Sequence, residues 1–241
     1  FRKDYNADPE LNPIRLEHES VDDVTHSVVE TEDGKLEERT NTIFSPQEFV
    51  VNIGPQHPAT HGVLRLRTSL DGETVKKIDV YCGYVHRGIE KLCESLTYPQ
   101  TLHFADRLDY LSAQQNRHAV CLCIEDALQV EVPARAQYIR TIMDELMRIS
   151  SHLLFWSTFC MDLGGTTAFF YGFRDREKIL DIFEETCGAR MTFNYYTIGG
   201  LMADLHPDFQ RKVKEFCAYM PAKLKEYHTL FTGNVIAQQR M

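Results

Sequence analysis

The spacing of apolar residues changes along the chain and predicts two kinds of structure. Residues 49–53 (FVVNI), 63–70 (VLRLRTSL) and 74–85 (TVKKIDVYCGYV) are typical of strands, with many β-branched side chains. The Asp71-Gly72 pair between the second and third runs is a strong signal for a tight hairpin turn. This part of the chain therefore predicts a small antiparallel sheet.

From about residue 87 onward, the apolar positions recur with the period of a helix. The pattern predicts helices at about 101–130, 134–160, 174–187 and 207–231. Pro133, Gly164-Gly165 and Gly188 mark helix boundaries, and Pro221 is expected to kink or split the last helix. The expected fold class is α+β, with the small antiparallel β-sheet followed by a helical bundle.

The composition is that of an ordinary globular protein, with 43% hydrophobic and 25% charged residues. No run of about 18 uncharged apolar residues is present, so no membrane-spanning helix is expected. The net charge of −9 is concentrated in residues 1–45, which hold twelve acidic and five basic residues and are interpreted as a linker or an extended tail. The lack of clustered Lys and Arg argues against binding to nucleic acid. Because the chain begins with Phe1 and ends without a clear helix stop, we expect it to be part of a longer protein.

The seven cysteines predict no metal site of their own. None forms a C-x-x-C pair, their number is odd, and most lie inside helical patterns, as in cytosolic proteins with buried, reduced thiols. A zinc or iron–sulfur site held by this chain alone is therefore not expected. The glycine-rich motifs that bind dinucleotides or nucleoside triphosphates are absent, and so are G-x-S-x-G and H-E-x-x-H.

The segment NIGPQHPATHGVLRL, residues 52–66, carries two histidines four residues apart. On a helix, His57 and His61 would share a face and could hold a metal, but Pro58 and the flanking glycines argue against a helix. The residues alone leave three interpretations open: a metal pair, a hydrogen-bonded structural loop, or a loop that places an imidazole in a cleft for proton transfer.

Three further polar positions have both an ordinary and a functional interpretation. Arg87 lies in GYVHRGIEKLCE, which is most simply a solvated helix start. Tyr110 lies on a helix with one apolar face, where a core tyrosine with a satisfied hydroxyl is the commoner case. Asp162 lies between apolar residues at a helix end, where partial burial would require a pairing cation and a simple turn aspartate is the alternative.

Taken together, several motifs follow one another in an order that resembles the D subunit of respiratory complex I, the quinone-site subunit of proton-pumping NADH:quinone oxidoreductase. They are GPQHPATHGVLRL, GYVHRGIEK, DRLDYL, MDLGG, FFYGFRDRE and YYTIGG, and the resemblance covers about residues 46–235. The opening FRKDYNADPELNPIRLE resembles the C-terminal tail of the C subunit. The resemblance thus implies part of a fused C–D subunit. Its expected regions are a tail at 1–45, a β region with the HPATHG loop at 46–86, and a helical bundle, incomplete at its C-terminus, at 87–241.

The D subunit is itself similar to the large subunit of nickel–iron hydrogenases, which implies a hydrogenase-large-subunit-like fold. Where the hydrogenase motif R-x-C-x-x-C binds metal, this chain has Asp109 and Ser112 in place of the two cysteines. Soft thiolate ligands for nickel are therefore absent from this motif. The resemblance implies that the former metal cavity takes an organic substrate and that this chain binds no metal.

The resemblance also assigns roles to single residues. His61 matches a loop histidine at the head of the quinone chamber, and Tyr110 matches the tyrosine that faces it. In this assignment both residues bind the quinone carbonyls and protonate the headgroup. Asp162 matches the aspartate that keeps this histidine charged and oriented.

Arg87, His152 and Thr192 match positions around the chamber wall and the terminal iron–sulfur cluster. Thr192 departs from the family pattern, because a histidine is common there in a G-A-R-M-H run and this chain reads GARMT. Tuning of the cluster through a proton on that side chain is therefore not expected.

The resemblance implies that electrons come from a 4Fe–4S cluster in a neighbouring B subunit, with quinone as the substrate and no cofactor bound by this chain alone. The other implied partners are the C-subunit part of the fusion, the I subunit and the membrane-arm subunits, on the cytoplasmic side of a bacterial inner membrane. Two alternatives are a hydrogenase-like subunit with a metal centre and a non-catalytic assembly scaffold. The identity of the quinone, and the choice of NADH, ferredoxin or another carrier as donor, are left open.

Overall fold

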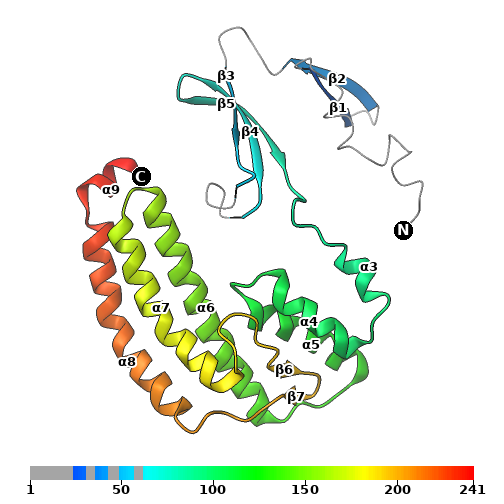
Figure 1. Ribbon diagram of the computed structural model, residues 1–241, viewed down its shortest axis with the longest axis vertical. Coiled ribbons are helices and arrows are strands. Elements are labelled where there is room, and N and C mark those ends of the chain that lie inside the picture. The colour runs from blue at the N-terminus through cyan, green and yellow to red at the C-terminus, as the bar shows by residue number, and fades with distance from the viewer. Residues whose placement is uncertain (1–23, 31–35, 43–48, 57–61) are drawn as a thin grey trace. The chain divides into compact units, whose positions relative to one another are not determined.

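The computed structural model describes residues 24–30, 36–42, 49–56 and 62–241 of the chain. The chain divides into two compact units, residues 1–87 and 88–241, which are considered separately (Figure 1). His57 and His61, in the HPATHG loop, lie outside the described residues.

The first unit contains a hairpin in the acidic segment. Strands β1 (Val24–Glu30) and β2 (Leu36–Thr42) are antiparallel, with Val24 opposite Thr42 and Glu30 opposite Leu36. β1 reads VTHSVVE, and its β-branched residues favour a strand. The hairpin adds two strands to a segment that its composition marks as a linker or tail.

The predicted antiparallel sheet is confirmed. Strands β3 (Phe49–Ile53), β4 (Arg65–Asp71) and β5 (Thr74–Tyr81) are hydrogen-bonded in this order. Gly72, with a φ of +60°, and Glu73 form the tight turn between β4 and β5. Residues that lie opposite one another across the three strands share a face. The exposed apolar residues on one such face are Phe49, Val51, Ile53, Val75, Ile78 and Val80.

The second unit begins with the short helix α3 (Ile89–Cys93). The single helix predicted at about 101–130 is divided into two helices in the structure. α4 (Tyr98–Leu108) ends where Asp109 has an extended backbone, and α5 (Ala113–Leu128) follows the turn. The Asp109 carboxylate accepts a hydrogen bond from the Leu111 amide over 2.9 Å, and its carbonyl accepts one from the Asn116 side chain over 3.0 Å. Aspartate commonly stabilises turns by bonding to the backbone two residues on. The prediction was wrong here because the helical period of the flanking residues runs through this turn.

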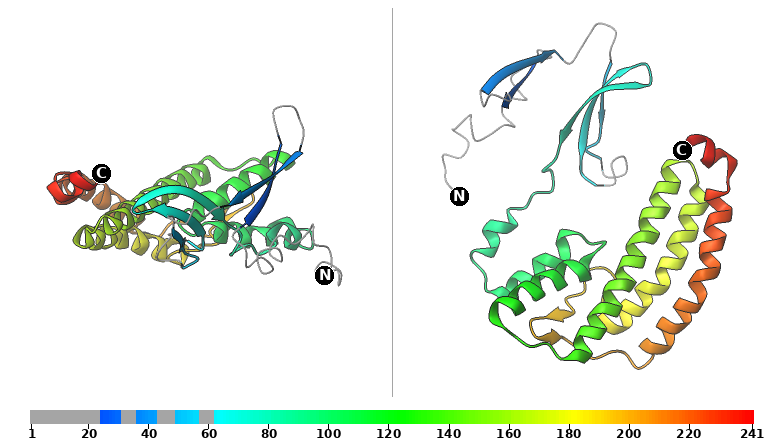
Figure 2. Two further views of the ribbon diagram at one scale, coloured as in Figure 1. Left: turned by 90° about the horizontal axis from the view of Figure 1, so that it is seen from above. Right: turned by 180° about the vertical axis from the view of Figure 1, so that it is seen from behind.

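Helices α6 (Ala134–Asp162), α7 (Thr166–Cys187) and α8 (Phe209–Tyr227) lie side by side (Figure 2). α6 confirms the helix predicted at 134–160, whereas α7 begins at Thr166 and not at residue 174. α8 continues into the π-helical turn η1 (His228–Thr232), so Pro221 lies inside the helix without splitting it. α9 (Val235–Arg240) follows. The predicted order of a small sheet followed by helices is therefore confirmed.

The connection between α7 and α8 forms a small antiparallel pair, β6 (Tyr196–Thr197) and β7 (Gly200–Leu201). Gly199, in the turn between them, has a φ of +86°. This pair contacts α5 and α6, so it is part of the packed unit and not a free loop.

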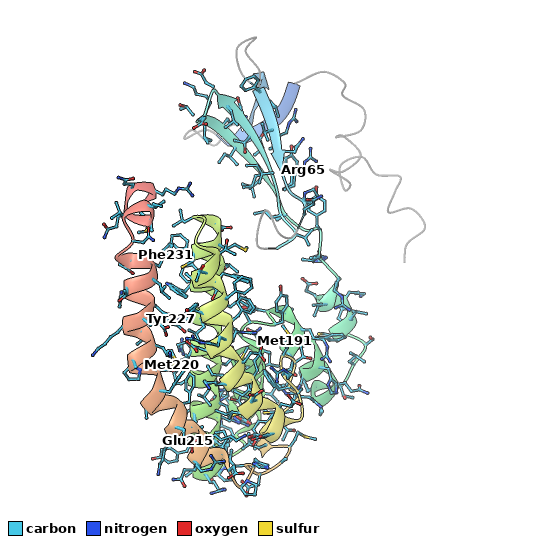
Figure 3. The ribbon with its side chains drawn as sticks, turned by 60° about the vertical axis from the view of Figure 1, so that its left-hand side comes forward. Arg65, Met191, Glu215, Met220, Tyr227 and Phe231 are labelled. Atoms are coloured by element: carbon cyan, nitrogen blue, oxygen red, sulfur yellow. The ribbon has the colours of Figure 1, made fainter. Side chains whose placement is uncertain are left out.

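The core of the second unit lies between the long helices. Trp156 of α6 stacks on Tyr227 of α8, with ring centroids 4.3 Å apart. Met220, Tyr227 and Phe231 follow one another along α8 and η1 on the side that faces α6 and α7 (Figure 3). In the described part of the chain, no helix combines the length and the apolar character that crossing a bilayer requires.

Candidate functional site

The connection after α7, residues 188–201, is held to the neighbouring helices by two buried ion pairs, and we call it the anchored loop. In the first pair, Nη1 of Arg117 lies 3.3 Å from Oδ2 of Asp106. The same carboxylate oxygen accepts a hydrogen bond from the Asn194 amide over 2.7 Å, and Arg117 donates to the Tyr196 carbonyl. Burial raises the pKa of Asp106 although Arg117 favours the charged form. This pair ties the loop to α4 and α5.

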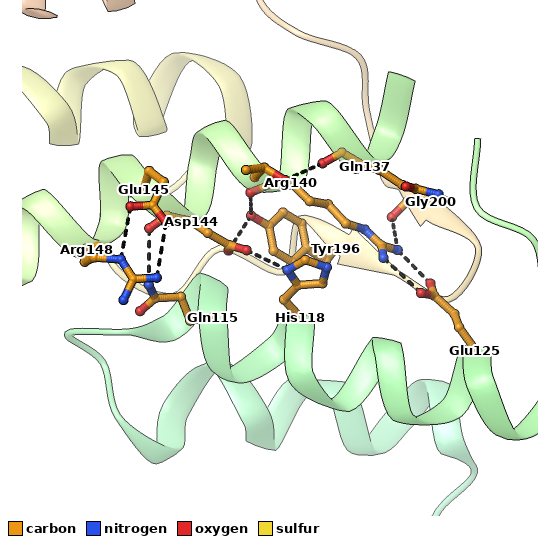
Figure 4. Close-up of polar contacts among 11 residues, drawn as sticks. Gln115, His118, Glu125, Gln137, Arg140, Asp144, Glu145, Arg148, Tyr196 and Gly200 are labelled. Atoms are coloured by element: carbon orange, nitrogen blue, oxygen red, sulfur yellow. Dashed lines mark hydrogen bonds and ion pairs between the residues drawn. The ribbon is translucent and has the colours of Figure 1, made fainter. Parts of the chain in front are cut away.

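The second ion pair joins Arg140 of α6 to Glu125 of α5 (Figure 4). Arg140 donates to both carboxylate oxygens, over 3.0 and 2.7 Å, and to the carbonyls of Thr197 and Gly200. Glu125 also accepts a hydrogen bond from the Gly199 amide over 2.8 Å. Burial alone would raise the pKa of Glu125, but the hydrogen bonds from Arg140 and Gly199 hold it below its ordinary value. Two charged groups thus fix the β6–β7 turn.

Tyr196 links the anchored loop to a third polar contact (Figure 4). Its phenol donates to Oδ1 of Asp144 over 2.9 Å, and Nδ1 of His118 lies 2.5 Å from the other oxygen of that carboxylate. The rings of His118 and Tyr196 meet edge to face. Burial and the neighbouring Asp144 raise the pKa of Tyr196, so the phenol stays protonated. The loop therefore bridges α5 and α6 through both its backbone and a side chain.

Thr192 lies in this anchored loop, next to the buried Phe193. Phe193 packs edge to face on Phe183 of α7, with ring centroids 4.9 Å apart. The Thr192 side chain is half-buried and its neighbour Met191 is exposed. Thr192 is thus presented near the surface by a segment whose backbone is fixed on both sides.

Tyr110 lies in the turn between α4 and α5, directly after Asp109. Its side chain is exposed. The ordinary interpretation of Tyr110 as a core tyrosine is therefore wrong, because the helix on which that interpretation rested is interrupted here. The turn presents the phenol at the surface of the second unit.

Asp162 is the last residue of α6 and precedes the Gly164-Gly165 pair, as expected. Its side chain is exposed in the second unit, so the expected partial burial is wrong for this unit. The reason is its position on the helix, because residue 162 falls on the outward face that also carries the exposed Phe155 and Phe159.

The outward face of α6 carries His152, Phe155, Phe159 and Asp162, a set that we call the α6 stripe. Their spacings of three or four residues place the four side chains on one side of the helix. Phe155 is 65% and Phe159 40% exposed, and their rings stack with centroids 6.0 Å apart. At the rise of an α-helix, the stripe is about 15 Å long. It is an exposed aromatic surface with an imidazole at one end and a carboxylate at the other.

A groove of about 420 Å³ between α6 and α8 adjoins the α6 stripe at His152. Most of its lining is apolar, and His228 is a second imidazole in it. The residues that line it are Ile149, His152, Leu153, Trp156, Met220, Leu224, Tyr227, His228 and Thr232. The groove therefore extends the apolar surface of the stripe toward α8.

The assigned residues fall in both units. Arg87, the last residue of the first unit, is exposed, and His61 lies outside the described residues. Within the second unit, the structure brings His152 and Asp162 onto one stripe. Tyr110 and Thr192 lie on two other connections, the α4–α5 turn and the anchored loop.

Within the described residues, no three His, Cys, Asp or Glu side chains gather in a group that could hold a metal ion. Cys121 and Cys160 are buried, and burial raises the pKa of each thiol to about 11. Cys82, Cys123 and Cys217 are exposed, so the expectation of buried thiols is wrong for these three.

Sequence reasoning gave no role to the four charged residues that anchor the loop. The sequence signal that could have identified them is that each of these charged residues lies among apolar residues on the buried face of a helix. Arg140 lies between Ile139 and Met143 on the buried face of α6, where a charge signals a buried partner. The partner itself, on another helix, cannot be read from the pattern.

Comparison with known proteins finds relatives along the whole chain. Residues 162–241 match the family model described as respiratory-chain NADH dehydrogenase, 49 Kd subunit. The whole chain is 65% identical to the C/D subunit of the NADH-quinone oxidoreductase of Phocaeicola vulgatus and 62% identical to that of Bacteroides fragilis, and it covers 46% and 45% of their lengths. Over 81% of the chain, it is 48% identical to the D subunit of the NADH-quinone oxidoreductase of Geobacillus kaustophilus, of which it covers 53%. The chain thus spans about half the length of the curated relatives that it matches, and the resemblance expected from its motifs is confirmed.

Proposed function

We propose that this chain, which belongs to the family of the C/D and D (49 kDa) subunits of NADH-quinone oxidoreductases, helps to form the site where such an enzyme reduces quinone to quinol. In this proposal the chain holds the quinone headgroup and supplies protons to it. The C/D relatives match the whole chain and the D relative matches 81% of it, which supports a C–D fusion.

The observation that carries the proposal is the α6 stripe. Neighbouring exposed aromatic rings of this kind are typical of surfaces that a ligand or another protein covers. A quinone is a flat, largely apolar ring with two carbonyl oxygens, and binding sites for such molecules combine apolar walls with a few polar groups. The two phenylalanines offer the apolar wall, and His152 and Asp162 offer the polar groups.

Reduction of a quinone adds two electrons and two protons, and negative charge develops on its two oxygens. A phenol and an imidazole can each donate a proton there, and such general acid catalysis contributes roughly 100-fold to 10,000-fold in rate. We assign these roles to Tyr110, whose phenol is exposed at the α4–α5 turn, and to His61. Asp162, at the end of the stripe, is assigned to hold the imidazole of His61 in its charged, oriented form.

The proposed electron source is a 4Fe–4S cluster of a neighbouring B subunit, which supplies electrons singly when it is bound. Thr192, on the anchored loop, is the residue of this chain proposed to lie near it. A threonine hydroxyl does not take up a proton near neutral pH. Proton uptake at this position, which a histidine would allow, is therefore not part of the proposal.

The same family resemblance supports proposed positions for two further residues and a proposed assembly. Arg87 is proposed to lie near the cluster and His152 at the chamber wall. The proposed assembly includes the I subunit and the membrane-arm subunits, on the cytoplasmic side of a bacterial inner membrane.

The proposal is tested with Tyr110→Phe and His61→Ala in the assembled enzyme. Each variant is expected to lower quinone reductase activity by roughly 100-fold or more. Electron transfer from the donor to a soluble ferric acceptor should be retained, because it does not use the quinone site. The matched control is Tyr138→Phe, which removes an exposed phenol of α6 and should leave both activities unchanged.

The α6 stripe is tested separately. Phe159→Ala should raise KM for quinone more than it lowers kcat, because it removes apolar contact, whereas Asp162→Asn should mainly lower kcat. Quinone reductase activity that survives in the Tyr110→Phe, His61→Ala double variant would favour a non-catalytic scaffold. Nickel bound stoichiometrically to the chain would favour a hydrogenase-like subunit.

A further inference from the structure

Arg176, in the middle of α7, is a buried cation without a partner among the described residues. It is 6% exposed, and its Nε is buried without a hydrogen bond. In the same described part of the chain, its guanidinium has no hydrogen bond or ion pair. Its nearest aromatic contact is Phe173, with 6.0 Å between Cζ and the ring centroid, at the outer limit of a cation–π interaction. Burial lowers the pKa of Arg176, and Glu177 opposes this only in part.

The other two buried arginines of this unit are well partnered, and so is the exposed Arg174. Arg140 donates to both oxygens of a carboxylate and to two carbonyls. Arg117 is paired with a carboxylate and donates to two carbonyls. Arg174, two residues before Arg176, donates to both oxygens of Asp175 over 2.8 and 2.9 Å. Arg176 departs from this pattern.

The carboxylates next to Arg176 in the chain are already paired. Asp175 accepts four hydrogen bonds, which fill the acceptor positions of a carboxylate. Their donors are the side chains of Arg174, Tyr219 and Tyr227. Glu177 pairs with Arg190. Turning Asp175 toward Arg176 would therefore leave the buried Tyr227 hydroxyl without its acceptor, and the exposed carboxylate of Glu177 is held by Arg190.

A buried guanidinium cannot avoid the free-energy cost of burying a charge by losing its proton, because arginine stays charged in proteins. Removing such an ion from water without a partner is expensive on the scale of domain stability. Its planar fork of N–H donors matches the two oxygens of a carboxylate. Of the three guanidinium nitrogens, only Nε is both fully buried and without a hydrogen bond. The small exposed part of Arg176 therefore includes Nη1 and Nη2, the nitrogens that a carboxylate would bind.

We propose that Arg176 binds a carboxylate supplied from outside residues 88–241, and that the two form a buried ion pair in the assembled protein. The carboxylate belongs to an Asp or Glu, either of another subunit or of another part of the same polypeptide, since the relatives are about twice as long as this chain. Both sources present the same chemical group. The inference concerns assembly and does not depend on the quinone chemistry at the α6 stripe.

The test uses Arg176→Lys in the assembled enzyme treated with a water-soluble carbodiimide. The reagent activates a carboxyl group, and a lysine amine in contact with that carbon forms an amide as the reagent leaves as a urea. Peptide mass spectrometry then locates the new bond. The matched control is Arg140→Lys, which should form an amide with Glu125 and so show that the reagent reaches an equally buried pair.

The expected result is an amide between residue 176 and an Asp or Glu outside residues 88–241. The peptide that carries this residue distinguishes another subunit from another part of the same polypeptide. With the control cross-linked, the lack of an amide at residue 176, or an amide to Glu177 alone, would overturn the proposal.

Arg176→Met gives an independent readout that needs no cross-link. Methionine keeps an apolar stem but leaves the external carboxylate buried and unpaired. The temperature at which the chain dissociates from the assembled enzyme should therefore fall by several degrees. A midpoint that stays the same or rises would mean that water satisfied Arg176, and it would overturn the proposal. Arg211→Met, at an exposed ion pair, is the control and should not shift the midpoint.

Discussion

Gly172 of α7 and Ser157 of α6 are so close that a β-carbon on Gly172 would lie 1.9 Å from the Ser157 Oγ. That hydroxyl is buried and donates to the Leu153 carbonyl over 2.6 Å, and the same β-carbon would lie 3.1 Å from this carbonyl oxygen. The bare backbone of α7 therefore packs directly against the Ser157 side chain of α6, and this packing depends on the absence of a side chain at residue 172.

Gly172→Ala is accordingly expected to destabilise the chain by roughly 1–3 kcal/mol, because α7 must move away from α6. Ser157→Ala removes the clashing oxygen and costs about 1 kcal/mol through its lost hydrogen bond. In the double variant, the loss in free energy of unfolding should be smaller than the sum of the losses in the two single variants. Urea unfolding of the three variants measures this coupling, with Gly200→Ala as a control because no atom lies within 4 Å of a β-carbon there. Strictly additive costs would contradict the close contact.

Arg140→Met is predicted to release the anchored loop. The substitution leaves Glu125 buried without its cation, which typically costs about 3–5 kcal/mol. Hydrogen exchange of residues 196–201 should become faster, because Arg140 also holds the carbonyls of Thr197 and Gly200. Arg148→Met breaks an exposed ion pair with Glu145 and should cost no more than about 1 kcal/mol. Equal effects of the two substitutions would show that burial of the pair is unimportant.

The three-stranded sheet and the long helix α6 could be predicted because short stretches of sequence determine them. The Gly72 turn and the flanking alternation locate the three-stranded sheet, and the apolar period of residues 134–160 locates α6. The break between α4 and α5 could not be located by period alone, because the helical spacing continues across it. The break is marked by one side chain, Asp109, whose carboxylate accepts a hydrogen bond from the Leu111 amide.

The candidate site was predictable only in part, for a different reason. The motifs single out Tyr110 and Asp162, but exposure is a property of the folded unit, and it contradicts the core interpretation of Tyr110 and the partial burial expected for Asp162. The α6 stripe follows from residue spacing once α6 is known to extend to Asp162. The ion pair between Arg140 and Glu125 joins two helices, and no local pattern specifies such a contact.

Tyr227→Phe is predicted to weaken the chain in a pH-dependent way. Burial opposes ionisation of Asp175, but hydrogen bonds from Arg174 and the tyrosines outweigh it and hold its pKa below the ordinary value. A lowered folded pKa contributes stability that is present above the unfolded value of about 3.9 and is lost as pH falls through the folded pKa. The substitution removes the Tyr227 hydroxyl, whose oxygen lies 2.5 Å from Oδ2 of Asp175. It should lower the free energy of unfolding by about 1–3 kcal/mol at pH 7.

The difference between Tyr227→Phe and the parent chain should shrink as the pH is lowered below about 4, since Asp175 is then protonated more readily in the variant. Thermal unfolding at several pH values measures it. Tyr138→Phe, which removes an exposed phenol, serves as the control and should show no difference at any pH. A penalty for Tyr227→Phe that is constant down to acid pH would show that Asp175 is not held in its charged form by this phenol.

Thr192→His should make the reduction potential of the 4Fe–4S cluster proposed to lie near this residue depend on pH in the assembled enzyme. An imidazole has an ordinary pKa of about 6.5, and the electron added on reduction favours its protonated form. The potential should therefore fall as pH rises through the imidazole pKa, by up to about 59 mV per pH unit, the one-electron equivalent of a tenfold change. The parent chain and the control Thr192→Asn have no group at this position that titrates near neutral pH. Redox titrations of the cluster signal between about pH 6 and 8 measure the effect. A flat potential in Thr192→His, with the variant assembled normally, would place the anchored loop away from the cluster.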